Sequence, residues 1–241
     1  MLAIIPARGG SKRIPKKNIR LFNGRPMITY AIETALRSGL FDEVSISTDC
    51  PDIADIALEH GAIIHALRSK ELSDDFTPTH SVIQETLKLH YPDLDDSTPV
   101  CCVYPCTPLL TVDHLIQAER ALTKHQAVDQ YIFPVLEFSS APQRALSIDA
   151  EGNLKSEYPA YEKKRTQDLK PLFYDAGQFY LGTKKCWLSN PEIHGNAIPI
   201  VMKKSSLVDI DTLEDWEMAE RQYQLRKSAI SPETQPMNRV R

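Results

Sequence analysis

The sequence predicts an α/β domain built on a mostly parallel central sheet. Short apolar runs alternate with amphipathic stretches along most of the 241 residues, as in strands joined by crossover helices. The length suits one sizeable α/β domain, and the 42% hydrophobic content is ordinary for a globular protein. We expect this domain to span residues 1–227, with a looser insertion at about 136–175 and a disordered tail over 228–241.

The first half of the chain carries clear strand and helix signals. Leu2–Pro6 is predicted to be the first strand, and Pro26 suits the first turn of a helix that Gly39 ends. The alternating apolar pattern of residues 44–48 predicts the second strand. The remaining elements expected here are a helix from Pro51 to Gly61, a strand near 62–65, a helix over 79–90 and a buried strand over 100–104.

The second half continues this alternation with one interruption. A helix is predicted from Thr111 to about Lys124, followed by a strand over 128–135. From Phe138 to Asp175 the pattern loosens around three prolines and Gly152, so we expect short strands and loops there. The last expected elements are strands over 178–181 and 198–202 and a helix over 212–226.

Composition restricts the compartment and the partners. No run approaches the roughly 18 apolar residues that cross a bilayer, and Arg8 and Gly9 interrupt the apolar start, so we expect neither a membrane segment nor a signal peptide. The net charge of −4 argues against general nucleic-acid binding. Five cysteines without a secretion signal predict reduced thiols in the cytoplasm.

A strongly basic loop follows the first predicted strand. The segment from Arg8 to Arg25 contains seven Lys or Arg, and the first acidic residue of the chain is Glu33. Because the net charge of the whole chain is −4, the residues outside this segment have a net charge of about −11. Backbone N–H groups of Gly9-Gly10-Ser11 can surround phosphate oxygens, which predicts a phosphate site. The loop has neither the P-loop pattern nor the dinucleotide-binding pattern of glycines. The alternatives are a solvated basic loop or a patch that meets an acidic partner chain.

The run Ile4-Ile-Pro-Ala-Arg-Gly-Gly-Ser-Lys-Arg-Ile-Pro-Lys-Lys-Asn-Ile19 closely resembles the N-terminal signature of the CMP-sugar cytidylyltransferases. Asp209-Ile-Asp-Thr212 resembles a C-terminal block of the same family, and weaker matches lie between the two in the same order. The resemblance covers Met1 to about Arg226. It implies a Rossmann-like, three-layer α/β/α nucleotidyltransferase fold with a small dimerisation insertion.

The resemblance also implies a CTP site and its catalytic groups. The residues assigned to CTP are Ala7, Arg8, Gly9, Gly10, Ser11, Lys12, Asn18, Thr77, Thr79 and Tyr104. The residues assigned to catalysis are Arg8, Lys17, Asn18 and Asp211. For Thr77 and Thr79, capping of the following helix is an equally weighted alternative.

Two carboxylates near the C-terminus predict a Mg²⁺ site. Asp209 and Asp211 are two residues apart, so an extended backbone would direct both side chains to one side. Paired carboxylates repel one another unless a cation intervenes, and Mg²⁺ prefers oxygen ligands. The alternative is a capping box with Asp211 at the N-cap and Glu214 three residues later, which leaves Asp209 without a role.

The implied reaction joins CTP to the anomeric hydroxyl of an acidic nine-carbon 2-keto sugar and releases pyrophosphate. Tyr104 and Leu110 stand where the sialate enzymes carry Gln and Arg. Three stretches look more like the pseudaminic acid cytidylyltransferases: Asp74-Asp-Phe-Thr77, Gln167-Asp-Leu169 and Asp175-Ala-Gly-Gln-Phe-Tyr180. We therefore expect pseudaminate as the sugar, activated for glycosylation of surface glycans or flagellin.

The resemblance assigns the sugar contacts to Arg165, Tyr174 and Gln178, and it implies a homodimer formed through the insertion. Three other sugars remain open as alternatives: sialate, legionaminate and KDO. A catalytically silent nucleotide-binding protein is the alternative outside enzymes, although such a protein would not need Asn18 together with Asp209 and Asp211.

Overall fold

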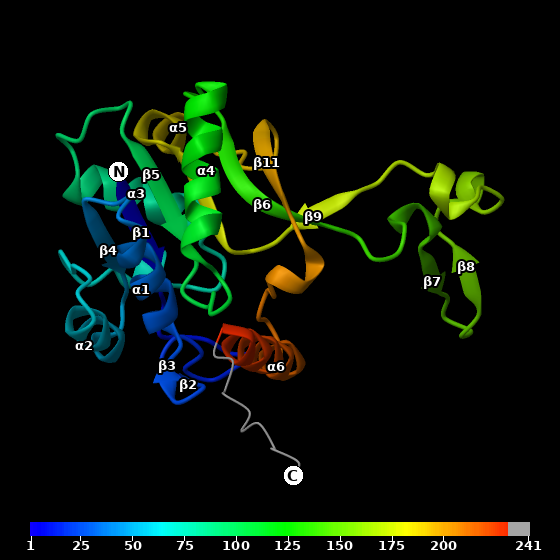
Figure 1. Ribbon diagram of the computed structural model, residues 1–241, viewed down its shortest axis with the longest axis horizontal. Helices are drawn as coiled ribbons and strands as arrows, with labels where there is room; N and C mark the ends of the chain where they lie inside the picture. Colours follow the sequence, from blue (N-terminus) through cyan, green and yellow to red (C-terminus); the bar gives the residue numbers. More distant parts are fainter. Residues whose placement is uncertain (231–241) are drawn as a thin grey trace, which may run out of the picture.

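A seven-stranded sheet lies at the centre of the computed structural model, which describes residues 1–230 (Figure 1). Its strands are, in spatial order, β11 (Ala197–Met202), β6 (Tyr131–Glu137), β10 (Phe179–Thr183), β5 (Pro99–Val103), β1 (Leu2–Pro6) and β4 (Glu43–Ser47), with β9 (Phe173–Asp175) paired to β6. Strands β4, β1 and β5 run parallel, and β11 runs parallel to β6. Only β9 and β10 run antiparallel to their neighbours, so the sheet is mostly parallel, as predicted.

Helices cover both faces of this sheet. Residues from α1 (Ile28–Ser38), α2 (Pro51–Glu59) and α4 (Val112–His125) share one apolar core with Ala3 and Ile5 of β1. Residues from α3 (Thr79–His90) and α5 (Lys184–Ser189) share the opposite core with Leu2 and Ile4. Successive side chains of a strand point to opposite faces, so β1 contributes to both cores. The result is the expected three-layer α/β/α arrangement.

Three local predictions differ from the structure. The strand expected near 62–65 is reduced to one bridge between Ser45 and Ile63, because the chain meets the sheet edge at a single residue and then turns away. Strands β2 (Leu21–Phe22) and β3 (Arg25–Pro26) form a short hairpin. Pro26 belongs to β3 and not to the first turn of α1, so the helix begins two residues later than predicted. Helix α5 was not predicted; the Thr183 hydroxyl caps it by accepting a hydrogen bond from the Cys186 N–H.

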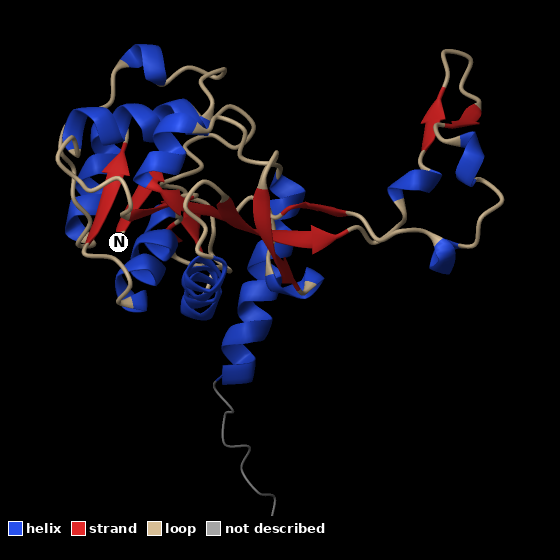
Figure 2. Ribbon diagram, turned by 90° about the horizontal axis from the view of Figure 1, so that it is seen from above, coloured by secondary structure: helices blue, strands red, loops and turns tan. Residues whose placement is uncertain are grey.

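The insertion forms an arm that extends away from the sheet (Figure 2). The chain leaves the sheet after β6 and returns in β9, which matches the predicted loose segment. The arm contains the hairpin of β7 (Leu146–Ile148) and β8 (Leu154–Ser156) and the short 3₁₀ helices Pro142–Arg144, Pro159–Tyr161 and Thr166–Asp168. Apolar side chains of this hairpin are exposed: Leu146 by 60%, Ile148 by 72% and Leu154 by 66%.

Helix α6 (Leu213–Ile230) lies against β2 and β3, far from them in sequence (Figure 1). Trp216 is buried and its ring meets Phe22 edge-on, with the centroids 5.5 Å apart. A third apolar core joins these residues to Ile14 and Ile210. The helix continues four residues past its predicted end, so residues 228–230 of the predicted tail are helical. The rest of that tail, 231–241, lies outside the described residues.

Replacing Trp216 with Ala should lower the free energy of unfolding by about 3–5 kcal/mol, because it removes a large buried ring and leaves a cavity beneath α6. Urea denaturation followed by circular dichroism measures this loss. Leu225→Ala is the matched control on the same helix, since Leu225 is 72% exposed and should change stability by less than about 0.5 kcal/mol. Equal stability of the two variants would contradict the anchoring role of Trp216.

Candidate active site

The phosphate loop begins directly after β1 and is fixed by the end of the neighbouring strand β4. The Gly9 N–H donates to Asp49 Oδ1 over 2.9 Å. A Cβ atom at Gly9 would lie 2.9 Å from the Cβ of Cys50, closer than real side chains approach, whereas a Cβ at Gly10 would meet nothing within 4 Å. Glycine is therefore required at the first of the two positions. Asp49 holds this loop and does not cap α2, whose N-cap is Cys50.

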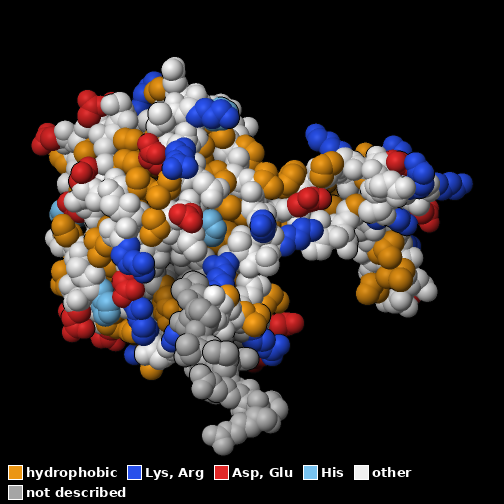
Figure 3. Space-filling view, in the orientation of Figure 1, with side chains coloured by type: hydrophobic (Ala, Val, Ile, Leu, Met, Phe, Trp, Pro, Cys, Tyr) orange, Lys and Arg blue, Asp and Glu red, His pale blue; other side chains and the backbone are white. Residues whose placement is uncertain are grey.

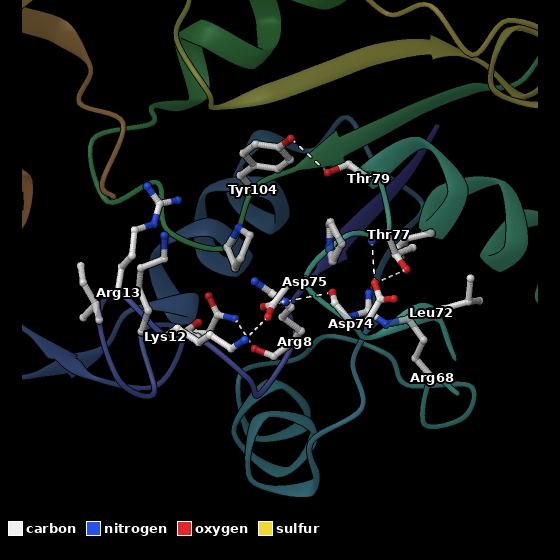
Figure 4. A pocket seen from close by; sticks show the side chains of 17 residues that line it. Arg8, Lys12, Arg13, Arg68, Leu72, Asp74, Asp75, Thr77, Thr79 and Tyr104 are labelled. Atoms are coloured by element: carbon white, nitrogen blue, oxygen red, sulfur yellow. Dashed lines mark hydrogen bonds and ion pairs between the residues drawn. The ribbon is translucent and has the colours of Figure 1, made fainter. Parts of the chain in front are cut away.

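The loop borders a hollow of about 280 Å³ that carries several cationic side chains (Figure 4). The Arg8 Nη1 donates to the Asp74 carbonyl over 2.9 Å and to Asp75 Oδ1 over 2.5 Å. The Lys12 ammonium also forms an ion pair with Asp75. Arg68 lies at the same hollow, and its guanidinium pKa is lowered by burial. A single carboxylate thus pairs with two cations of the phosphate loop.

Asn18 and Lys17 link the loop to the rest of the site. Asn18 is 5% exposed; its Nδ2 donates to the Arg8 carbonyl over 2.8 Å, and its Oδ1 accepts from the Cys106 thiol over 3.1 Å. The Lys17 Nζ donates to the Ile210 carbonyl over 2.7 Å. The loop is therefore attached directly to the segment that carries the two predicted metal ligands.

The carboxylate of Asp211 faces the phosphate loop. Its Oδ1 lies 2.8 Å from Arg13 Nη2 and 3.7 Å from Lys17 Nζ. The alternative capping box of Asp211 with Glu214 is wrong by one residue. Thr212 caps α6 instead: its hydroxyl accepts from the Asp215 N–H over 3.2 Å, and Asp215 Oδ2 accepts from the Thr212 N–H over 2.7 Å. The Asp211 carboxylate is thus not used in capping the helix.

Asp209 lies where negative charge is crowded. A Cβ at Gly177 would come within 2.8 Å of its Cγ, so the carboxyl packs against a glycine with a positive φ of 60°. Packing of the carboxyl against the protein, followed by the charge of Asp211, raises the pKa of Asp209 to about 6, although the residue as a whole is exposed and solvent screens part of this effect. Lys17 acts in the opposite direction but does not offset the other contributions. Such a pair favours a bound cation.

A second hollow adjoins the first and shares Thr79 and Tyr104 with it. The two hydroxyls are hydrogen-bonded at 3.1 Å, and the Tyr104 ring meets Tyr180 edge-on at 5.5 Å. Burial raises the pKa of Tyr104 to about 12, so its hydroxyl stays protonated. The remaining residues of the second hollow are Pro78, His80, Pro191, Glu192, Ile193, His194 and Gly195.

Most of the residues predicted to bind CTP meet at the first hollow: Arg8, Ser11, Lys12, Asn18, Thr77, Thr79 and Tyr104, together with Lys17. Ala7 lies instead in the apolar core, and Gly9 and Gly10 do not line the hollow. The capping alternative for Thr77 and Thr79 is wrong, because Pro78 precedes α3 and no side chain caps it. The Thr77 hydroxyl donates to Asp74 Oδ1 over 2.7 Å.

The three residues predicted to bind the sugar lie elsewhere in this chain. Gln178 is fully buried, and its Nε2 donates to the carbonyls of Ala176 and Val208, so it joins two backbone segments. Arg165 lies on the arm, where its guanidinium binds Asp168 at 2.7 and 3.1 Å. Tyr174 lies on β9 with its ring 4.9 Å from Phe138. None of the three lines either hollow.

Several side chains that line the hollows have no assigned role in the sequence prediction, among them Arg68 and Asp75 of the first and Tyr180 and His194 of the second. Arg68 belongs to a stretch that resembles a family motif, which is a usable signal. Asp75 belongs to Asp74-Asp-Phe-Thr77, which also resembles the pseudaminic acid cytidylyltransferases, so it had a signal as well. His194 carries no such signal, because its position depends on how the loop before β11 folds over the ends of the strands.

Comparison with known proteins identifies the family of this chain. The family model described as cytidylyltransferase matches residues 2–186. The chain belongs to the cytidylyltransferase family. It is therefore a nucleotidyltransferase. The basic loop lies within the matched residues, whereas Asp209 and Asp211 lie beyond them.

Individual relatives match over nearly the full chain. The chain is 40% identical to the pseudaminic acid cytidylyltransferase of Campylobacter jejuni, covering 93% of this chain and 96% of the relative. It is 31% identical to the CMP-N,N'-diacetyllegionaminic acid synthase of Legionella pneumophila, covering 95% and 99%. Among solved structures, a CMP:2-keto-3-deoxy-manno-octonic acid synthetase complexed with CTP superposes with a TM-score of 0.69 at 16% identity, covering 93% and 98%. The last match supports the Rossmann-like fold.

Gly9→Ala should weaken CTP binding at least about tenfold, because the added Cβ collides with Cys50 and displaces the loop. Gly10→Ala is the matched control and should change the affinity by no more than about twofold, since its Cβ meets open space. Titration calorimetry with CTP measures both. Equal affinities for the two variants would refute the close approach of the loop to Cys50.

Asp209→Asn should stabilise the protein in metal-free buffer at pH 7.5 by about 1 kcal/mol, after discounting the pKa shift for solvent contact. The folded pKa lies above the unfolded value of about 3.8, so the ionised carboxyl opposes folding above pH 6. The gain should shrink as the pH falls from 6 towards 4, where the folded carboxyl becomes protonated. Thermal melts in EDTA across this range measure it.

Asp211→Asn serves as the contrast to Asp209→Asn, since it removes ion pairs with Arg13 and Lys17 and should give no such gain. The difference in melting temperature between Asp209→Asn and the unmodified protein should therefore depend on pH. A difference that stays constant between pH 4 and 7.5 would contradict the crowding of charge at Asp209.

Proposed function

We propose that this cytidylyltransferase forms CMP-pseudaminate and pyrophosphate from CTP and pseudaminate. The observation that carries the proposal is the 40% identity, along nearly the whole chain, to a pseudaminic acid cytidylyltransferase. The hollows support it, because a basic phosphate site and a separate, more aromatic hollow meet at Tyr104. The legionaminate enzyme, at 31% identity, makes CMP-legionaminate the second candidate.

The first hollow suits the triphosphate of CTP. Arg8, Lys12 and Lys17 would neutralise the phosphates, and the backbone of the loop would approach them closely at Gly9. The anomeric oxygen of the sugar attacks the α-phosphorus, and the bond to the bridging oxygen breaks as pyrophosphate leaves. This chemistry depends on alignment and charge neutralisation, so no covalent enzyme intermediate is required. Asn18 would position the loop through its bond to the Arg8 carbonyl.

Asp209 and Asp211 would hold the Mg²⁺ that the sequence predicts. Burial, and then the charge of Asp211, raises the pKa of Asp209, which suits a position beside a bound cation. Among residues 1–230 no three His, Cys, Asp or Glu side chains converge as a complete metal site. Two carboxylates completed by substrate phosphate and water are nevertheless a common Mg²⁺ arrangement. When bound, the ion would supply charge stabilisation at the α-phosphate.

The second hollow is our proposed place for the sugar acid. It adjoins the CTP hollow at Tyr104, so a sugar there would lie next to the α-phosphate end of the nucleotide. Tyr180, Ile193 and two prolines give it apolar walls, which suit a sugar with acylamino groups better than a fully hydroxylated one. Tyr174, which the resemblance assigns to the sugar, lies on β9 instead.

We further propose a homodimer formed through the arm. The arm extends away from its own sheet and exposes Leu146, Ile148 and Leu154, which form an apolar surface at its outer part (Figure 3). Arg165 lies on the same arm, away from both hollows of its own chain. In a dimer the arm would bring Arg165 to the sugar acid bound by the other protomer.

We place the reaction in the cytoplasm, where CTP is made. All five cysteines are unpaired thiols, and four of them are buried, which suits a reducing compartment. Within residues 1–230, the helices are too short or too polar for one of them to cross a membrane.

Purified protein should release pyrophosphate from CTP and Mg²⁺ with pseudaminate, and faster than with sialate, legionaminate or KDO. A coupled pyrophosphate assay across this panel measures the rates. Release with none of the sugars would defeat the enzyme proposal, and release with sialate but not pseudaminate would defeat the choice of sugar.

Asp211→Ala should keep the fold but reduce Mg²⁺-dependent turnover at least about 100-fold, because it removes one of two carboxylates facing the reacting phosphate. It should also remove the rise in melting temperature that Mg²⁺ and CTP together give the unmodified protein. Turnover that stays within threefold of the unmodified rate would refute the metal role of Asp211.

Light scattering should give a mass of about twice the 27.2 kDa of one chain. Ile148→Asp should yield a monomer, because it places a charge in the apolar surface of the arm. Leu225→Asp, an equally exposed position on α6, is the control and should stay dimeric. A monomeric unmodified protein would overturn the dimer proposal.

A further inference from the structure

The second hollow contains a hydrogen-bonded group of side chains that the reaction described above does not use. Asp175, at the end of β9, accepts at Oδ2 from the Tyr180 hydroxyl over 2.6 Å and from His194 Nε2 over 2.7 Å. Its Oδ1 accepts from the Gly177 N–H over 2.8 Å. Both oxygens of a largely buried carboxylate are therefore occupied, and His194 is the only one of these partners that reaches it from the loop before β11.

Aromatic contacts hold the His194 ring as well. Its centroid lies 5.3 Å from Phe133 and 6.3 Å from Tyr180, in both cases edge-on. Yet 65% of the side chain is exposed, so the ring gains little from burial. A side chain that is fixed by one carboxylate and two rings, while still open to solvent in a hollow, is arranged as ligand-recognising groups are.

The carboxylate determines which nitrogen of His194 can meet a ligand. An ionised carboxylate can only accept, so Nε2 must carry the proton that is donated to Asp175. Nδ1 makes no hydrogen bond within residues 1–230, which leaves it open to a ligand in the hollow. In the neutral ring Nδ1 is an acceptor, and it therefore pairs with an N–H or O–H donor.

We propose that His194 is a specificity-determining residue that accepts a hydrogen bond from an acylamino N–H of the sugar acid. The apolar side chains beside it, Pro191 and Ile193, would receive the methyl group of the same acyl substituent. Asp175 acts through His194 as a positioning residue. This inference rests on the proposed function, because it assigns a role within the sugar hollow.

The test compares the unmodified protein with His194→Ala and His194→Gln in steady-state kinetics. His194→Ala should raise the KM for pseudaminate about tenfold, the usual effect of one lost hydrogen bond, with kcat and the KM for CTP within about twofold. Gln keeps an amide oxygen as acceptor, so His194→Gln should recover at least half of the loss on a logarithmic scale. Both variants should melt within about 2 °C of the unmodified protein, since the side chain is exposed.

A sugar without the donor gives a second readout. For 2-keto-3-deoxy-manno-octonic acid, which has no acylamino group, the KM or the competitive inhibition constant should change by less than about twofold in His194→Ala. His125→Ala, at an exposed histidine in the last turn of α4, is the matched control and should behave as the unmodified protein. An unchanged KM for pseudaminate in His194→Ala, an equal loss for both sugars, or no recovery with Gln would each overturn the proposal.

Failure of the proposed function would look different. The unmodified protein would then release no pyrophosphate with pseudaminate, and calorimetric binding of the two sugars in the presence of CTP would decide the role of His194. Pseudaminate binding that weakens about tenfold in His194→Ala would support it. Equal binding to both proteins, or no binding to the unmodified one, would overturn it.

Discussion

The candidate active site depends on one hydrogen bond that joins a segment near the N-terminus to a segment near the C-terminus. The Lys17 ammonium donates to the Ile210 carbonyl, across 193 positions of sequence, while its charge lies 3.7 Å from Asp211. The apolar core of Phe22 and Trp216 beneath it excludes water and keeps α6 against the loop. The site can therefore form only in the complete fold, because the phosphate loop comes from the first strand and the carboxylates from the approach to the last helix.

Most strands of the sheet could be predicted from the sequence, because a buried strand appears as a short apolar run. The crossover helices appear as amphipathic stretches between these runs. The direction of β10 could not, since Phe179–Thr183 is buried on both faces and looks the same in either orientation. The strand predicted over residues 62–65 was wrong for a related reason. Their composition suits a strand, but only Ile63 meets the sheet edge, and pairing depends on where the chain turns.

The phosphate half of the site was predictable because its residues are consecutive and chemically distinctive. The rest depends on contacts between distant segments. Thr212 and Asp215 form the capping box one residue later than the alternative weighed for Asp211 and Glu214, and the sequence allows both positions equally well. The resemblance assigned a sugar contact to Gln178, but its side chain lies in the interior and donates to backbone carbonyls. Arg165 lies on an arm that extends away from the sheet, so its own chain does not bring it to either hollow.

The carboxylate of Asp75 already occupies two of the cations that a triphosphate would need. A nucleotide bound as we propose would have to break the pairs with Arg8 and Lys12, so part of its attraction would go into exchanging one anion for another. The exchange would run in reverse as pyrophosphate leaves, because the carboxylate of Asp75 would pair again with the two cations. Cations without such a partner would bind pyrophosphate more tightly and release it more slowly. A carboxylate that competes for the same cations would speed its dissociation.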